Sequence, residues 1–154
     1  MRAAADRCPS LPGSTGFSLW TVGVIAAALV PPFSIAPTRA AEAQVVRIAG
    51  NLSKIAITDD ARSKAVVIFT ERCATCHGAD GRGNGPAAVN LKPKPIDFHS
   101  RNWQKSVSDE NITKAIIFGG RSVGKSGQMA PNPDLENEPE IVAALVDKIR
   151  KWGR

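Results

Sequence analysis

The sequence predicts an all-α fold of about three to five helices, with long loops wrapped around one bound group. Three segments carry apolar residues at helical spacing, beginning near residues 59, 108 and 138. Between them lie stretches rich in glycine and proline, which break regular structure. A loop of some thirty residues is uncommon in a small domain, and this chain has little apolar bulk of its own for such a loop to enclose.

The first residues resemble an export signal. Arg2 and Arg7 precede an uncharged run over residues 17–30, and small residues suited to a protease end at Ala43. The run is shorter than the roughly 20 residues of a bilayer-spanning helix, which makes a retained membrane anchor the less favoured alternative. We therefore expect an export signal over residues 1–43 and one domain over residues 44–154, with membrane contact only if the leader is retained.

Cleavage after Ala43 would leave a chain with 17 Lys plus Arg against 12 Asp plus Glu, a net charge of +5. Cys8 would leave with the signal. Cys73 and Cys76 are separated by only two residues at a predicted helix end, where a disulfide would constrain little. A domain of this size buries enough surface to fold without one, so the two sulfurs need another use.

The first predicted helix covers residues 59–72, with Thr58 or Asp59 as its N-cap. Its apolar positions are Ala61, Ala65, Ile68 and Phe69. It runs directly into Cys73, so its last turn carries both cysteines. Residues 44–57 are mildly apolar without a clear period, and no element is predicted there.

A loop over residues 78–107 follows. Ser108 then caps a second helix that glycines end at residues 119–120, with Ile112, Ala115 and Ile116 as its inner face. The last helix, about residues 138–152, has an acidic start and a basic end, which suits the helix dipole. Its predicted inner face is Ile141, Leu145, Ile149 and Trp152.

The segment RCATCHGADGRGNGP, residues 72–86, contains the motif CxxCH. Two thiols one helical turn apart can each add across a vinyl group of a haem, and His77 follows at once to bind the iron. CxxCH is the signature of c-type haem attachment. The sequence therefore predicts one covalent haem c with its iron, held by Cys73, Cys76 and His77.

Two other interpretations of the motif are less favoured. A zinc site could use Cys73, Cys76, His77 and His99, but adjacent Cys and His ligands suit a tetrahedral site poorly. A thioredoxin-like redox pair would need a βαβ context, which the sequence does not offer.

The glycines after the motif would let the backbone approach a flat porphyrin. Pro86 is placed so that its carbonyl could accept the Nδ1 proton of His77, fixing the imidazole tautomer and raising its basicity toward iron. Met129, in a loop followed by Pro131 and Pro133, is the favoured sixth ligand. His99 is its rival, and a bis-histidine iron would have a markedly lower reduction potential.

These residues resemble class I cytochrome c, and within it the bacterial monohaem carriers. The resemblance rests on CATCHGADGRGNGP, IIFGGRSVGKSGQM and EIVAALVDKIRKW, and covers about residues 65–152. It implies thioethers at Cys73 and Cys76, proximal ligation by His77 with support from Pro86, and distal ligation by Met129.

The chain also departs from the family pattern. The family has an aromatic residue one turn before the first cysteine, where Phe69 stands, and crosses its first and last helices through a glycine and an aromatic. Here Ala65 and Lys148 occupy those two positions. We expect Trp152 to fill the crossing. Ala130 separates Met129 from the proline that commonly follows the family's methionine.

If both axial positions are filled, the chain is a monomeric electron carrier rather than an enzyme, working in the periplasm or another exported location. Basic residues in its loops would steer it toward redox proteins with acidic docking surfaces, and nucleic acid is not an expected partner. These residues are Arg82, Lys92, Lys94, Arg101, Lys105 and Lys125. Two alternatives stay open: a haem enzyme or sensor with an open or His-ligated sixth site, and a permanent haem subunit of a dehydrogenase or oxidase.

Overall fold

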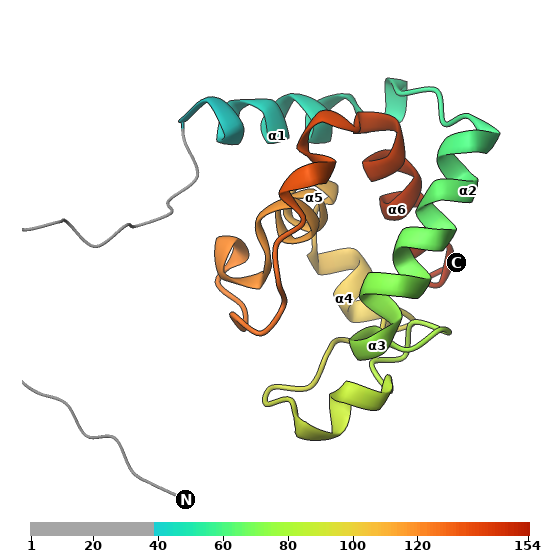
Figure 1. Cartoon of the computed structure of the whole chain (residues 1–154), viewed down its shortest axis with the longest axis vertical. Helices are drawn as coiled ribbons and strands as arrows, with labels where there is room; N and C mark the ends of the chain where they lie inside the picture. The colour runs from blue at the N-terminus through green and yellow to red at the C-terminus, as the bar shows by residue number, and fades with distance from the viewer. Residues whose placement is uncertain (1–38) are drawn as a thin grey trace, which may run out of the picture. The chain divides into compact units, whose positions relative to one another are not determined.

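The computed structural model describes residues 39–154, and this part of the chain contains helices and no β-strand. The α-helices longer than a single turn are α1 (Arg39–Asn51), α2 (Asp59–Ile68), α4 (Arg101–Ser106), α5 (Asp109–Phe118) and α6 (Pro139–Lys151) (Figure 1). The all-α prediction is confirmed. Most of the predicted export signal lies outside the described residues. Because α1 begins at Arg39, it spans the predicted boundary at Ala43, which stays a prediction.

The first predicted helix is confirmed, including its junction with the motif. Thr58 caps α2 by accepting a hydrogen bond from the backbone N–H of Ala61 at 3.1 Å. The helical path continues through a π-helical turn, η2 (Phe69–Cys73), into the single α-helical turn α3 (Ala74–His77). Gly78 ends it at φ 79°, a conformation that favours glycine.

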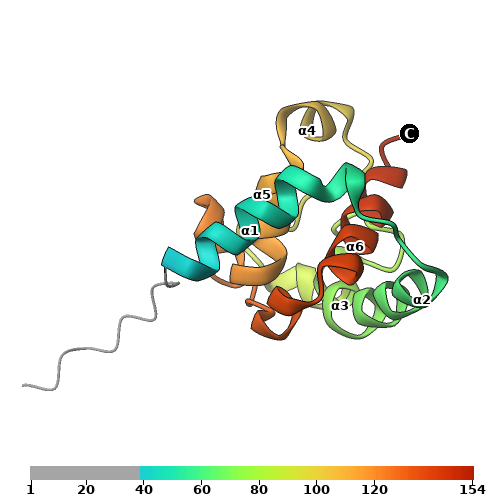
Figure 2. The same cartoon turned by 90° about the horizontal axis from the view of Figure 1, so that it is seen from above.

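α2 and α6 pack against each other, as both views show (Figure 2). Ala65 and Phe69 are each 1% exposed at this crossing. The ring centroids of Phe69 and Trp152 lie 5.1 Å apart. Lys148 places its Nζ 4.8 Å from the centroid of the Trp152 ring, a cation–π contact. Trp152 thus fills the crossing, as expected from the sequence.

α5 begins at its Ser108 cap and ends at Gly119, as predicted. Its buried residues are Ile112, Thr113, Ile116 and Ile117, so Ala115, predicted to face inward, is only partly buried. The predicted inner face of α6 is also found, with Ile141, Leu145 and Ile149 buried.

Several elements lie where the sequence predicted none. α1 packs on α5 through the buried Ile48, and the end of α1 continues into the 3-10 helix η1 (Leu52–Lys54). Within the predicted loop 78–107 lie α4, capped by Ser100, and the 3-10 helix η3 (Pro86–Asn90). Two more 3-10 helices, η4 (Gly120–Val123) and η5 (Pro133–Asn137), flank the methionine loop. None of the described helices is long and apolar enough to cross a bilayer.

Candidate haem-attachment site

Cys73, Cys76 and His77 lie together on the last helical turns before Gly78. Both cysteines are free thiols and half-buried. Residues three apart on a helix share a face, so the two sulfurs are placed to react with one flat group. This arrangement agrees with the motif's predicted use.

The glycine turn folds back onto the motif through two backbone hydrogen bonds. The N–H of Gly83 donates to the carbonyl of His77 at 2.7 Å, and that of Gly85 donates to Cys76 at 3.2 Å. A side chain at Gly85 would collide with the carbonyls of Ala74 and Thr75. At this point the glycine allows two segments of the chain to approach closely.

One aromatic ring packs on His77, and two more pack against that ring. Its imidazole stacks on Phe98 with ring centroids 4.7 Å apart and an interplanar angle of 14°. Phe98 in turn contacts Trp103 and Trp152. A Cβ at Gly81 would lie 2.8 Å from the Trp152 ring, so this turn needs glycine for space and for its φ of 76°. Phe98 and Trp103 were not predicted from the sequence, although Ser100 as an N-cap signal could have revealed α4.

Burial sets the protonation of the motif. It lowers the pKa of His77, and the backbone of Ile96 raises this pKa by a smaller amount. Burial also raises the pKa of the Cys73 thiol to about 11, although the positive charge of Arg72 lowers that pKa by a smaller amount. At neutral pH the imidazole is therefore neutral, the form that binds metal, and this thiol is protonated.

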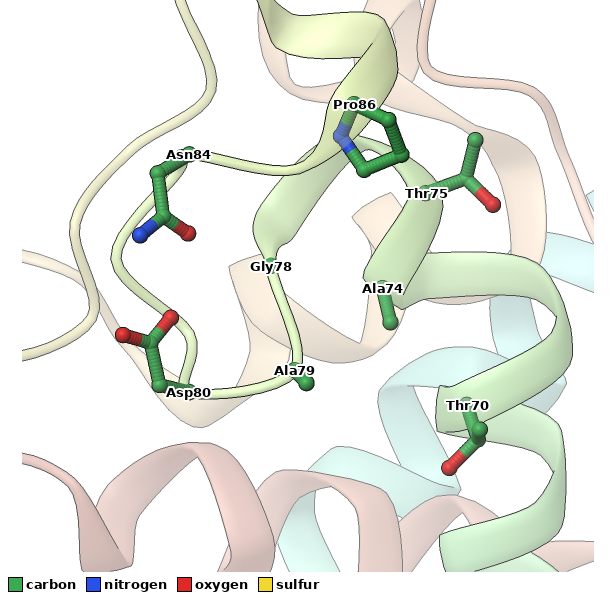
Figure 3. Close-up of a pocket in the computed structure, with 8 residues that line it drawn as sticks. All are labelled: Thr70, Ala74, Thr75, Gly78, Ala79, Asp80, Asn84 and Pro86. Carbon is green, nitrogen blue, oxygen red and sulfur yellow. The ribbon is translucent and has the colours of Figure 1, made fainter.

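The Nδ1 atom of His77 is buried and has no hydrogen-bond partner. Pro86 is exposed, and it lines a hollow with Thr75, Gly78 and other residues of the helix end and the glycine turn (Figure 3). The predicted bond from Nδ1 to the carbonyl of Pro86 is not formed in this structure. It stays a prediction for the haem-loaded protein.

Met129 lies in a loop that backbone hydrogen bonds close. The N–H of Gly120 donates to the Met129 carbonyl at 3.0 Å, and the N–H of Asn132 donates to Ile117 at 2.9 Å. The half-buried Met129 side chain lines a hollow with Phe118, Pro131 and other residues. This hollow shares no residue with the one beside Pro86. The role of Met129 as ligand stays a prediction.

His99 has contacts of its own. Its Nε2 lies 2.9 Å from the carbonyl of Asp80, so Nε2 donates and carries the proton. His99 is half-buried, and this contact joins two parts of the glycine-rich loop. Among residues 39–154 no three His, Cys, Asp or Glu side chains gather as a metal site, and the zinc reading gains no support.

The residues present fit a covalently attached haem. They offer two free thiols on one helix face, and a neutral imidazole whose Nδ1 is buried and unpartnered. The family model for cytochrome c matches residues 63–150. The chain belongs to the cytochrome c family. This cytochrome c domain binds haem c with its iron, and its cysteines are those of the CxxCH motif.

One relative of this cytochrome is the thiosulfate dehydrogenase of Stutzerimonas stutzeri (strain A1501), which is 25% identical over 99 residues. The alignment covers 57% of this chain and 32% of the relative. The chain thus spans about a third of the length of that enzyme.

Proposed function

We propose that this cytochrome is an exported monohaem carrier that moves single electrons between redox partners, with iron ligated by His77 and Met129. The observation that carries the proposal is the CxxCH turn, with its paired free thiols and half-buried neutral imidazole inside a cytochrome c domain. When bound, haem supplies a one-electron redox centre. The chain holds the cysteines and the imidazole at one helix end and stacks Phe98 on the imidazole.

Met129 is proposed as the distal ligand because it lies in a loop pinned at both ends to the C-terminal end of α5. We expect the ferric protein to show a sulfur-to-iron absorption band that disappears in Met129→Ala. Gln128→Ala, an exposed neighbour, is the matched control and should keep the band. Ready binding of carbon monoxide by the ferrous wild type would contradict the assignment.

His99 supplies the test of the alternative ligation. Its hydrogen bond to Asp80 supports a structural role, so His99→Ala should leave the ferric spectrum unchanged. A bis-histidine iron would instead lose its low-spin spectrum in this variant and keep it in Met129→Ala.

Export is proposed from the order of charged, apolar and small residues that ends at Ala43. Expression in a host that matures c-type cytochromes should yield a coloured periplasmic protein whose N-terminal sequence begins at Gln44. A start upstream of residue 17 would instead indicate a retained anchor. Extraction of the colour by acidified acetone would contradict covalent attachment.

A second candidate function is a haem module working with a dehydrogenase. The similarity to part of a thiosulfate dehydrogenase favours it over other catalytic readings. Native mass separates the two functions, because a free carrier elutes as a monomer and a module co-elutes with its enzyme. Reduction of the isolated protein by thiosulfate would favour activity within this chain.

A further inference from the structure

The segment after the glycine turn carries exposed apolar and basic side chains side by side in the sequence. Val89 is 77% exposed and Ile96 is 38% exposed. Lys92 and Lys94 lie between them and are exposed as well. We refer to these four side chains as the 89–96 patch.

The patch has a fixed backbone. Val89 lies on η3, which the buried Ala88 anchors and which exposes Val89 as a consequence. The carbonyl of Pro95 packs on Gly83, where a Cβ would collide with it. Because proline restricts φ, Pro93 and Pro95 further stiffen the segment. A rigid surface loses little conformational entropy when a partner binds.

The patch is also strongly one-sided in charge. Residues 81–96 contain three basic residues and no acidic one. Arg82 pairs with Asp80 at 3.4 Å, but neither Lys92 nor Lys94 forms an ion pair with a carboxylate of the described residues. Two ammonium groups without an ion pair, in the same short segment as exposed apolar side chains, suit a partner with carboxylates around an apolar area.

The patch lies close to the haem-attachment turn along the chain. η3 starts directly after Gly85, whose N–H donates to Cys76, and Gly83 donates to His77. A protein seated on Val89 would therefore be separated from the motif by a short path of covalent and hydrogen bonds. Short paths favour electron transfer, because electronic coupling decays with distance.

From these observations we infer that the 89–96 patch is the docking surface for a redox protein with an acidic, partly apolar face. This inference rests on the proposed carrier function and adds the location and chemistry of the contact. Each encounter moves one electron between the partner and the iron of this protein, so one is oxidised and the other reduced by the same electron.

The test uses reduced flavodoxin, an acidic protein with an exposed apolar cofactor edge, as the probe for the ferric haem-loaded protein. Stopped-flow absorbance gives the second-order rate constant at several salt concentrations. We expect Lys94→Glu to lower it about 3- to 10-fold at low ionic strength, with the difference shrinking as salt is added. Val89→Ser should lower it about 3-fold at every salt concentration, since it removes apolar contact rather than charge.

Two variants outside the patch control for net charge and for surface valine. Lys54→Glu makes the same charge change on η1, at the opposite end of the described fold from η3 (Figure 1). Val67→Ser alters a valine that is 52% exposed on α2. The second-order rate constant of both variants should stay within about 2-fold of the wild-type value.

Equal effects of patch and control variants would overturn the inference. So would loss of binding to anionic lipid vesicles in Lys94→Glu while the flavodoxin rate is unchanged, because the patch would then contact membranes. Failure of the carrier function is visible separately. A wild-type protein that ascorbate does not reduce, or whose ferrous form binds carbon monoxide, contradicts that function before any variant is compared.

Discussion

At the scale of single residues, the chain contains two buried polar side-chain atoms without a hydrogen-bond partner among the described residues, and they have different meanings. His77 Nδ1 belongs to the haem-binding motif. Thr113 Oγ1 lies on α5, and its residue is 0% exposed. A buried hydroxyl without a partner costs free energy, because it has lost its hydrogen bonds to water. Thr113 is therefore a point where the fold can be improved.

Thr113→Val should stabilise the haem-loaded protein by about 1 kcal/mol, since valine has nearly the same shape and no hydroxyl to desolvate. Chemical denaturation followed by circular dichroism measures the change. Thr113→Ser keeps the hydroxyl and loses a methyl group, so it should destabilise by about 1 kcal/mol. A destabilised valine variant would mean that the hydroxyl has a partner in solution.

At the scale of elements, the sequence predicted best what is local. The CxxCH turn, the Thr58 and Ser108 caps and the apolar faces of α5 and α6 depend on neighbours within a turn or two. α4 was missed because its six residues are too few to show a period. The Phe98 stack on His77 joins residues 21 apart in sequence with no repeating pattern between them, so no local signal predicts it.

Ion pairs join α2 to α6. Asp147 on α6 accepts hydrogen bonds from Arg62 on α2 at 3.0 Å, and from Lys151 and Arg154 nearby. Partial burial by itself raises the pKa of Asp147, but the hydrogen bonds from Lys151, Arg62 and Arg154 outweigh it, and the pKa is lowered. A carboxylate with a lowered pKa in the folded state stabilises the fold above its unfolded pKa.

Asp147→Asn should therefore destabilise the protein by about 1 kcal/mol at pH 7, near the upper end for exposed ion pairs. The difference from wild type should shrink as the pH falls below the unfolded value of 3.8 and through the lower folded pKa. Unfolding curves at pH 7 and at a series of acidic pH values on both sides of that unfolded value measure it. Asp134→Asn removes a carboxylate that is paired with Arg72 alone, so it should destabilise the protein less than Asp147→Asn does. A loss of stability in Asp147→Asn that does not vary with pH would indicate an effect on packing instead of charge.

At the scale of the whole molecule, α1 extends the domain beyond the part that matches the family model, which begins at residue 63. Residues 44–57 show no clear period in the sequence, because Ile48 is the one fully buried residue of α1 among those whose side chains are described. Its contribution depends on α5, a helix that lies far along the chain. Ile48 nevertheless belongs to the same apolar core as Ile112 and Val142.

If α1 is part of the folded unit, Ile48→Ala should destabilise the haem-loaded protein by about 2–4 kcal/mol, the cost of a cavity at a buried isoleucine. Val46→Ala, on the same helix at a side chain 50% exposed, should change stability by less than about 0.5 kcal/mol. Denaturant unfolding monitored through the haem absorbance and through circular dichroism should give one transition in both variants. If Ile48→Ala lowers the stability as little as Val46→Ala does, α1 adds little to the core. Since the predicted cleavage after Ala43 leaves Ile48 in the mature chain, the same comparison tells whether an exported protein starting at residue 44 keeps this helix as part of its fold.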